Sequence, residues 1–228
     1  MNHFSVLIRL LRDRPAVLDE IRQDIKLERK IVSLLISSTV FLAVYGAIIG
    51  ASSSWLQMLS SAVKLPALYL ITLIICLPTL YFFDILFGST LNFRQYTAMV
   101  LTAVSVISVL LFSFAPVSLF FLISVQGYSF FLLLNVAIMG LTGVVGIKLF
   151  YDGMRDVAAH QADEDKLRNR LLKGWLVLYA LVGSQLGWTL RPFFGAPSEQ
   201  FQLFRPEIDG NFYGQVFRMI FQIFGIDF

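Results

Sequence analysis

Few residues in this chain have side chains that could catalyse a reaction. The two histidines, His3 and His160, both lie outside the long apolar runs of the sequence. A pair of facing carboxylates is needed for aspartyl protease chemistry, and the predicted membrane spans contain a single carboxylate, Asp84. No HExxH, CxxC or phosphate-binding glycine motif occurs, and the chain has one cysteine, Cys76. We therefore predict that the protein is not an enzyme and uses no cofactor.

Four potential metal ligands recur at every fourth position, namely Asp152, Asp156, His160 and Glu164. A helix would align them on one face, where carboxylates and an imidazole could ligate a divalent cation. One helix alone rarely supplies a complete site, and neighbouring basic residues offer ordinary salt bridges. We favour a solvated charged face, which could equally dock a cytoplasmic partner, and we predict no metal site.

Among the polar residues of the predicted spans, three stand out: Asp84, Asn135 and Gln185. An intramembrane carboxylate is costly and marks either an ion path or a buried pair. Asp84 lies close to Arg94 in sequence, so a structural role is favoured over gating. Asn135 and Gln185 can hydrogen-bond between helices. Alternatively, these two amides line a polar pathway together with Gln126, which is expected to face the far side.

The elements that would carry these residues are transmembrane helices. Apolar residues make up 57% of the 228, and charged residues only 14%. Residues 31–63, 65–83, 95–147 and 174–190 contain no Asp, Glu, Lys or Arg. About 20 residues of helix cross the hydrocarbon core, so the longest run accommodates two crossings with a turn near Pro116. We predict an all-α bundle of five spans, near 31–51, 66–87, 95–115, 125–148 and 172–190.

Basic residues are distributed unevenly between the two sides of this bundle. With these spans, fourteen Lys and Arg residues fall on the side of the N-terminus and four on the other side. Cytoplasmic loops carry such an excess. The N-terminus is therefore predicted to be cytoplasmic and the C-terminus to lie on the far side of the membrane.

Three segments flank the spans. Residues 1–30 read as a broken amphipathic helix that lies either on an anionic leaflet or on the protein's own loops. The charged segment 149–171 is expected to form a helical cytoplasmic hairpin. The far-side tail, residues 191–228, contains an amphipathic helix at the interface or against a partner helix, with Phe217, Phe221 and Phe224 on one face. Acidic residues nearly balance the basic ones in 1–30, so no nucleic-acid binding is predicted.

The end of the fifth span combines an aromatic residue with a cation. Trp188 and Arg191 are expected at the far headgroups, with Trp188 as an interfacial anchor and Arg191 extending outward. Small residues also form faces that let helices approach closely: Gly140, Gly143 and Gly146 on the fourth span, and Ala180, Gly183 and Gly187 on the fifth. We expect these two faces to pack together, either within one chain or between two copies.

The layout of a cytoplasmic N-terminal segment, five close spans over residues 31–190 and a far-side C-terminus resembles the Yip1-like membrane proteins. The stretch SQLGWTLRPFFGAP is also similar to a signature shared among bacterial membrane proteins. The first resemblance implies a non-enzymatic role in membrane organisation or partner recruitment. We predict a scaffold, assembly or regulatory subunit that contacts lipids and a protein partner or a second copy, in a bacterial inner membrane. The alternative is a small channel or transporter subunit that uses Asp84, Asn135 and Gln185.

Overall fold

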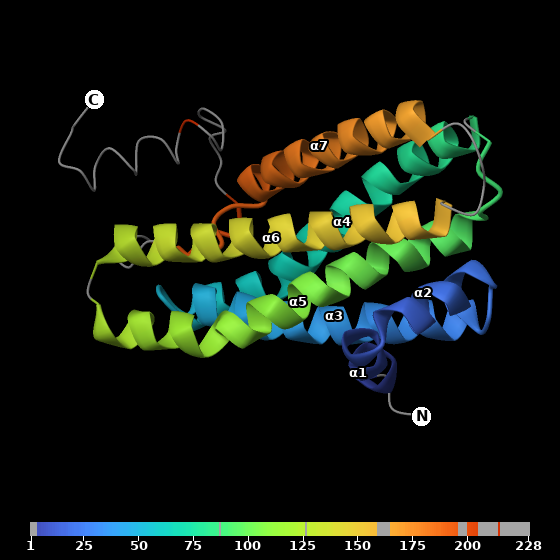
Figure 1. Ribbon diagram of the computed structural model, residues 1–228. Coiled ribbons are helices and arrows are strands. Elements are labelled where there is room, and N and C mark those ends of the chain that lie inside the picture. The colour runs from blue at the N-terminus through green and yellow to red at the C-terminus, as the bar shows by residue number, and fades with distance from the viewer. Residues whose placement is uncertain are drawn as a thin grey trace.

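A computed structural model of the chain describes residues 4–86, 88–125, 127–158, 165–195, 200–204 and 214, and its secondary structure in these ranges is helical. The helices are α1 (Phe4–Arg12), α2 (Arg14–Arg22), α3 (Leu27–Gly50), α4 (Trp55–Leu86), α5 (Phe93–Ser124), α6 (Tyr128–Ala158) and α7 (Asp165–Thr189). The long helices α3 to α7 run side by side in one bundle, and α1 and α2 lie at its flank (Figure 1).

Four of these helices, α3 to α6, are long and apolar enough to cross a membrane. The shortest of them, α3, has 24 residues. A helix rises by about 1.5 Å per residue, so α3 reaches about 36 Å, whereas the hydrocarbon core is about 30 Å thick. The fold therefore fits a multi-pass membrane protein. Helix α7 has 25 residues, but it includes several charged residues in its first turns and the polar Gln185 further along, and it is not one of the four.

The second long helix begins much earlier than expected. α4 starts at Trp55 and runs through Pro66, where the span was predicted to begin. Lys64, which was expected in a loop, lies within α4 and is only 5% exposed. Proline is tolerated inside membrane helices because neighbouring groups satisfy the carbonyl that it leaves free.

The turn between the third and fourth spans is also displaced. α5 continues through Pro116 to Ser124, and α6 begins at Tyr128, so the connection lies at residues 125–127 and not at Pro116. At the other end, Asn92 and Gln95 form a reciprocal capping box that starts α5. α6 then extends to Ala158, so the charged segment 149–171 consists largely of the adjoining ends of α6 and α7.

A very close backbone contact joins α3 to α4 through two glycines. A Cβ atom on Gly46 would lie 2.3 Å from the carbonyl oxygen of Ser61, and one on Gly50 would lie 2.5 Å from that of Gln57. These two glycines form a GxxxG pair that is not part of the two glycine faces predicted from the sequence. Small-xxx-small faces allow such close backbone approach in membranes.

The N-terminal helices pack on the protein itself. Leu7 and Leu10 of α1 and Val17, Leu18 and Ile21 of α2 are buried. Hydrogen bonds fix α2 to the bundle: the guanidinium of Arg14 donates to the carbonyl of Leu149 in α6, and the amide of Gln95 in α5 donates to the last carbonyls of α2. Of the two expectations for residues 1–30, this supports contact with the protein's own helices, although α1 keeps an exposed apolar face.

Candidate functional site: buried polar groups of the long helices

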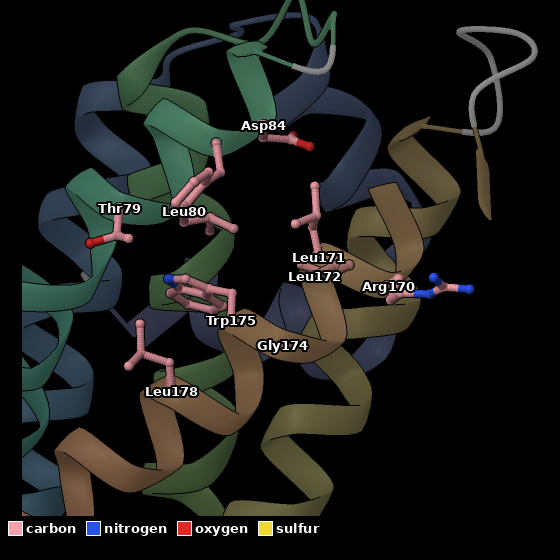
Figure 2. Close-up of a pocket in the computed structure, with 10 residues that line it drawn as sticks. Thr79, Leu80, Asp84, Arg170, Leu171, Leu172, Gly174, Trp175 and Leu178 are labelled. Atoms are coloured by element: carbon pink, nitrogen blue, oxygen red, sulfur yellow. The ribbon is translucent and has the colours of Figure 1, made fainter. Parts of the chain in front are cut away.

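A pocket of about 240 Å³ lies between the last turns of α4 and the first turns of α7. Figure 2 shows that its walls are mostly apolar, with Leu80 on α4 and Leu172, Trp175 and Leu178 on α7. Asp84 contributes the one carboxylate of the lining, and the guanidinium of Arg170 extends away from the pocket. The pocket could therefore accept an apolar group that carries a cation or a hydrogen-bond donor.

Asp84 is 8% exposed and is anchored by a neighbouring helix. The hydroxyl of Tyr96 in α5 donates a hydrogen bond to Oδ2 of Asp84, and Ser89 contacts the same hydroxyl at 2.7 Å. Arg94, a suggested partner of Asp84, forms a salt bridge with Glu28 at 2.9 Å. The tyrosine hydroxyl stabilises a buried carboxylate because it supplies a donor where water is scarce.

Asn135 lies at the centre of a second polar cluster, which joins three helices. Its Oδ1 accepts hydrogen bonds from the hydroxyl of Tyr45 in α3 at 2.7 Å and from the hydroxyl of Ser118 in α5 at 2.8 Å. Its amide donates to the carbonyl of Phe131 at 2.8 Å. All three side chains, Tyr45, Ser118 and Asn135, are buried completely. The hydrogen-bonding groups of Asn135 thus find partners within the protein, and they link α6 to α3 and α5.

A third cluster lies at the opposite end of α4 from Asp84. Gln57, Ser61 and Lys64 are all at most 5% exposed. Gln57 Nε2 and Lys64 Nζ donate to the carbonyl of Pro192, at 2.7 and 3.2 Å. Ser61 donates to the carbonyl of Phe193, and Lys64 also donates to that of Leu203. These bonds hold the segment that follows α7 across the end of the α3–α4 pair.

Two further contacts secure this segment. Ser52 donates to the carbonyl of Phe194 at 3.0 Å, and the ammonium of Lys64 lies 4.7 Å from the centre of the Phe204 ring. Sequence reasoning missed the cluster, although a signal exists: Gln57, Ser61 and Lys64 follow an i, i+4, i+7 spacing, which places them on one helix face.

The structure does not bring the three polar candidates together. Asp84 contacts Tyr96 near the start of α5, whereas Asn135 contacts Ser118 near the end of the same helix. The distance between these two positions corresponds to about 30 Å of helix. Gln185 is half-buried on α7, and its carbonyl accepts a hydrogen bond from Thr189.

Within one chain, the predicted glycine faces do not pack against each other. A Cβ on Gly183 or Gly187 would lie 3.6 Å or 3.9 Å from Thr72 or Leu68, so this part of α7 meets α4. A Cβ on Gly146 would overlap the side chain of Ile107, so this part of α6 meets α5. The faces do not meet within one chain because α7 lies along α4 and contacts α6 only slightly, and packing between two copies stays a prediction.

The other members of the two faces have few neighbours. Ala180, one turn before Gly183, is exposed. Gly140 and Gly143 have no neighbouring atom within 4 Å of an added Cβ in the described part of the chain. This side of α6 is therefore open to lipid or to another helix.

The structure places two of the expected interface anchors, Trp188 and Arg191, against each other. Trp188 is 9% exposed, and the guanidinium of Arg191 stacks 3.4 Å from the centre of its ring. Such a short distance indicates a cation–π contact, so the ring of Trp188 supports Arg191, and their position at the headgroups stays a prediction. Phe217, Phe221 and Phe224 lie outside the described residues.

The row of potential metal ligands is described only in part. Asp152 and Asp156 lie on α6, while His160 and Glu164 lie outside the described residues. Among the residues that are described, no group of three or more His, Cys, Asp or Glu side chains could hold a metal ion.

Comparison with protein-family models, with curated proteins and with solved structures finds no match to this chain. The resemblance to Yip1-like proteins therefore stays a prediction, and function has to be argued from the chain's own residues.

Proposed function

We propose that this protein is a non-enzymatic membrane scaffold, an assembly or regulatory subunit that works through helix contacts with a protein partner and with lipids. One observation carries the proposal: the buried side chains of Asn135, Gln57 and Lys64, within the apolar helices, hold the protein's own helices and segments together. The Tyr45–Ser118–Asn135 cluster joins α3, α5 and α6, and Gln57 and Lys64 bind backbone carbonyls. A conducting path needs polar groups that are available to a solute along its length.

A fifth crossing by α7 is part of the proposal. The indole of Trp175 donates to the carbonyl of Cys76 at 3.0 Å, and Gly187 lies next to Leu68. α7 therefore runs antiparallel to α4 over much of the apolar length of that helix. If α4 crosses the membrane, a helix that packs along most of its apolar length crosses the membrane as well. With five crossings, the excess of basic residues on the N-terminal side supports a cytoplasmic N-terminus and a far-side C-terminus.

The open face of α6 is the surface that we propose for a partner helix. Gly140 and Gly143 have room around them, and Leu141 and Val144 beside them are 56% and 64% exposed. Lipid would also cover such a face. A partner helix would gain from the close backbone approach that glycine permits. The proposed setting is a bacterial inner membrane, in a role like that suggested by the Yip1-like layout.

The test is a mild-detergent pull-down of the protein, tagged at its N-terminus, from its native membrane. We expect a stoichiometric partner or a defined homo-oligomer, which Gly140→Leu disrupts. Gly174→Leu is the matched control, because Gly174 on α7 also has open space around it. A protein that purifies as a monomer without partners would contradict the proposal.

The alternative, a channel or transporter subunit, draws support from the pocket beside Asp84. It requires that Asp84→Asn abolish solute flux in proteoliposomes while the protein still inserts normally. The scaffold proposal expects that variant to assemble like the wild-type protein. These two results separate the alternatives.

A further inference from the structure

A second cavity, of about 510 Å³, lies between α1, α2 and the beginning of α3. Four basic residues line it, namely Arg9, Lys26, Arg29 and Lys30. Glu20 supplies the one carboxylate of the lining, so the walls carry a net charge of three positive units. Val6, Val17 and Ile25 add apolar surface. The volume falls within the range of roughly 300–1,000 Å³ that is usual for small-molecule sites.

Glu20 neutralises only part of this charge. It forms salt bridges with Arg9 at 2.6 Å and with Lys30 at 2.8 Å, and Lys30 is nearly buried. Lys26 and Arg29 are exposed. Within the described ranges, no carboxylate forms a salt bridge with either of them. These two cations beside the cavity are therefore available to an anion.

The turn before α3 directs these residues toward the cavity. Asp24 and Lys26 both adopt left-handed backbone conformations, with φ of 57° and 51°. Such conformations are unfavourable for residues other than glycine. Here they reverse the chain within a few residues, so that Ile25 and Lys26 join Arg29 and Lys30 at the same cavity.

The cavity lies where the apolar part of α3 begins. The charge-free run starts immediately after Lys30, so in the proposed orientation the cavity is level with the cytoplasmic headgroups. On α1, Phe4, Ile8 and Leu11 follow an i, i+4, i+7 spacing and are 40% to 52% exposed. This exposed apolar stripe is suited to contact with acyl chains, next to cations suited to a phosphate.

We infer that this cavity binds the phosphate headgroup of an anionic phospholipid, with Lys26 and Arg29 as its principal ligands and the exposed face of α1 against the acyl chains. The inference rests on the membrane orientation proposed above. A free phosphate would use the same cations. The apolar stripe favours a lipid, because a soluble anion has no use for it. Arg29 presents a guanidinium, whose fork geometry matches phosphate oxygens.

The test uses the full-length protein, purified in mild detergent, and counts bound ligand by native mass spectrometry. Three probes are added separately: phosphatidylglycerol, phosphatidylcholine and inorganic phosphate. The cavity variant is K26Q/R29Q. The matched control is R12Q/R22Q, which removes the same charge from exposed residues of the same segment that do not line the cavity.

We expect the wild-type protein and the control to retain phosphatidylglycerol in preference to phosphatidylcholine. The cavity variant should bind phosphatidylglycerol at least about tenfold more weakly than the wild-type protein does. Equal weakening in both variants would overturn the inference, because binding would then depend on overall charge alone. Equal retention of both lipids, or comparable binding of inorganic phosphate, would overturn it as well.

A second measurement does not depend on any variant. A photoactivatable phosphatidylglycerol is reacted with the wild-type protein in vesicles, and the labelled peptide is identified by mass spectrometry. Labelling within residues 4–30 is expected, and labelling confined to other segments would refute the site. Both experiments use the purified protein without a partner, so they can fail while the pull-down succeeds, or succeed while it fails.

Discussion

The hydroxyl of Tyr45 donates a hydrogen bond to Oδ1 of Asn135 at 2.7 Å, which connects α3 to α6 across 90 positions of sequence. Ser118 of α5 donates to the same oxygen. One amide thus joins three helices in a region where the surrounding side chains are apolar. In a membrane, where apolar burial contributes little to helix association, such a bond contributes measurably to the choice of neighbours.

We expect Asn135→Leu to destabilise the bundle by about 1–2 kcal/mol, because it removes the acceptor of two interhelical hydrogen bonds. Tyr45→Phe should cost about 0.6 kcal/mol, since Ser118 keeps its bond to Asn135. Unfolding of the detergent-solubilised protein by added SDS measures both. Ser113→Ala is the control, as Ser113 is exposed and bonds only within its own helix. Equal effects of the three changes would contradict this role.

Gly46→Ala should destabilise the protein by about 1–3 kcal/mol, because the added methyl overlaps the backbone of α4 and forces the helices apart. The same SDS titration measures the effect. Gly140→Ala is the matched control, since open space surrounds Gly140 in the described structure. A neutral Gly46→Ala variant would contradict the close backbone contact between α3 and α4.

The general architecture follows from the sequence because charge is so costly within a bilayer. Runs without charged residues predict helices, and the four most apolar helices are found where those runs lie. Helix ends are harder to predict, because a helix continues beyond the hydrocarbon whenever its next residues favour it. Lys64 lies within α4, where backbone carbonyls accept its hydrogen bonds, and α5 passes Pro116, because proline is tolerated in membrane helices.

The polar clusters were predictable only in part. Asp84 and Asn135 could be singled out because each is polar within an apolar run. Their partners could not, since Tyr45 and Asn135 are far apart in sequence and only the tertiary fold brings them together. Gln57 and Lys64 were missed for a related reason: the carbonyls that they bind lie in the segment after α7, where the sequence shows only turn residues.

We expect Lys64→Met to release the segment that follows α7, because this change removes the donor to the carbonyls of Pro192 and Leu203 while keeping an unbranched side chain. Limited digestion with chymotrypsin should then cleave within residues 193–204 faster than in the wild-type protein. Lys148→Met, at an exposed position of α6, is the control. Unchanged cleavage would show that other contacts suffice to hold the segment.

Asp84→Asn should change stability by less than about 1 kcal/mol, because the amide oxygen still accepts the hydrogen bond from Tyr96. Asp84→Leu should cost about 1–3 kcal/mol, because it deprives the tyrosine hydroxyl of this acceptor. SDS-induced unfolding measures both variants. Stability losses of the same size for both would indicate that the charge of Asp84 is essential to the fold, which would assign the carboxylate an ion-pairing role.

The salt bridges of Glu20 predict a dependence of stability on pH. The hydrogen bond from Lys30 is the largest influence that lowers the pKa of Glu20 below its ordinary value of 4.5, and the bond from Arg9 lowers it further. A carboxyl group with a lowered pKa in the folded state contributes its full stabilisation above the unfolded pKa. This contribution is lost as the pH falls below 4.5 and through the lower folded value.

Thermal unfolding of the solubilised protein should therefore show a constant difference between the wild-type protein and Glu20→Gln above about pH 5, and a shrinking difference below pH 4.5. The difference should also fall with added salt, because the side chain of Glu20 is 22% exposed and that of its partner Arg9 is 55% exposed. A difference that grows as the pH is lowered would mean that Glu20 is destabilised as an anion, and the cavity between α1, α2 and α3 would then lack the ion pairs that shape it.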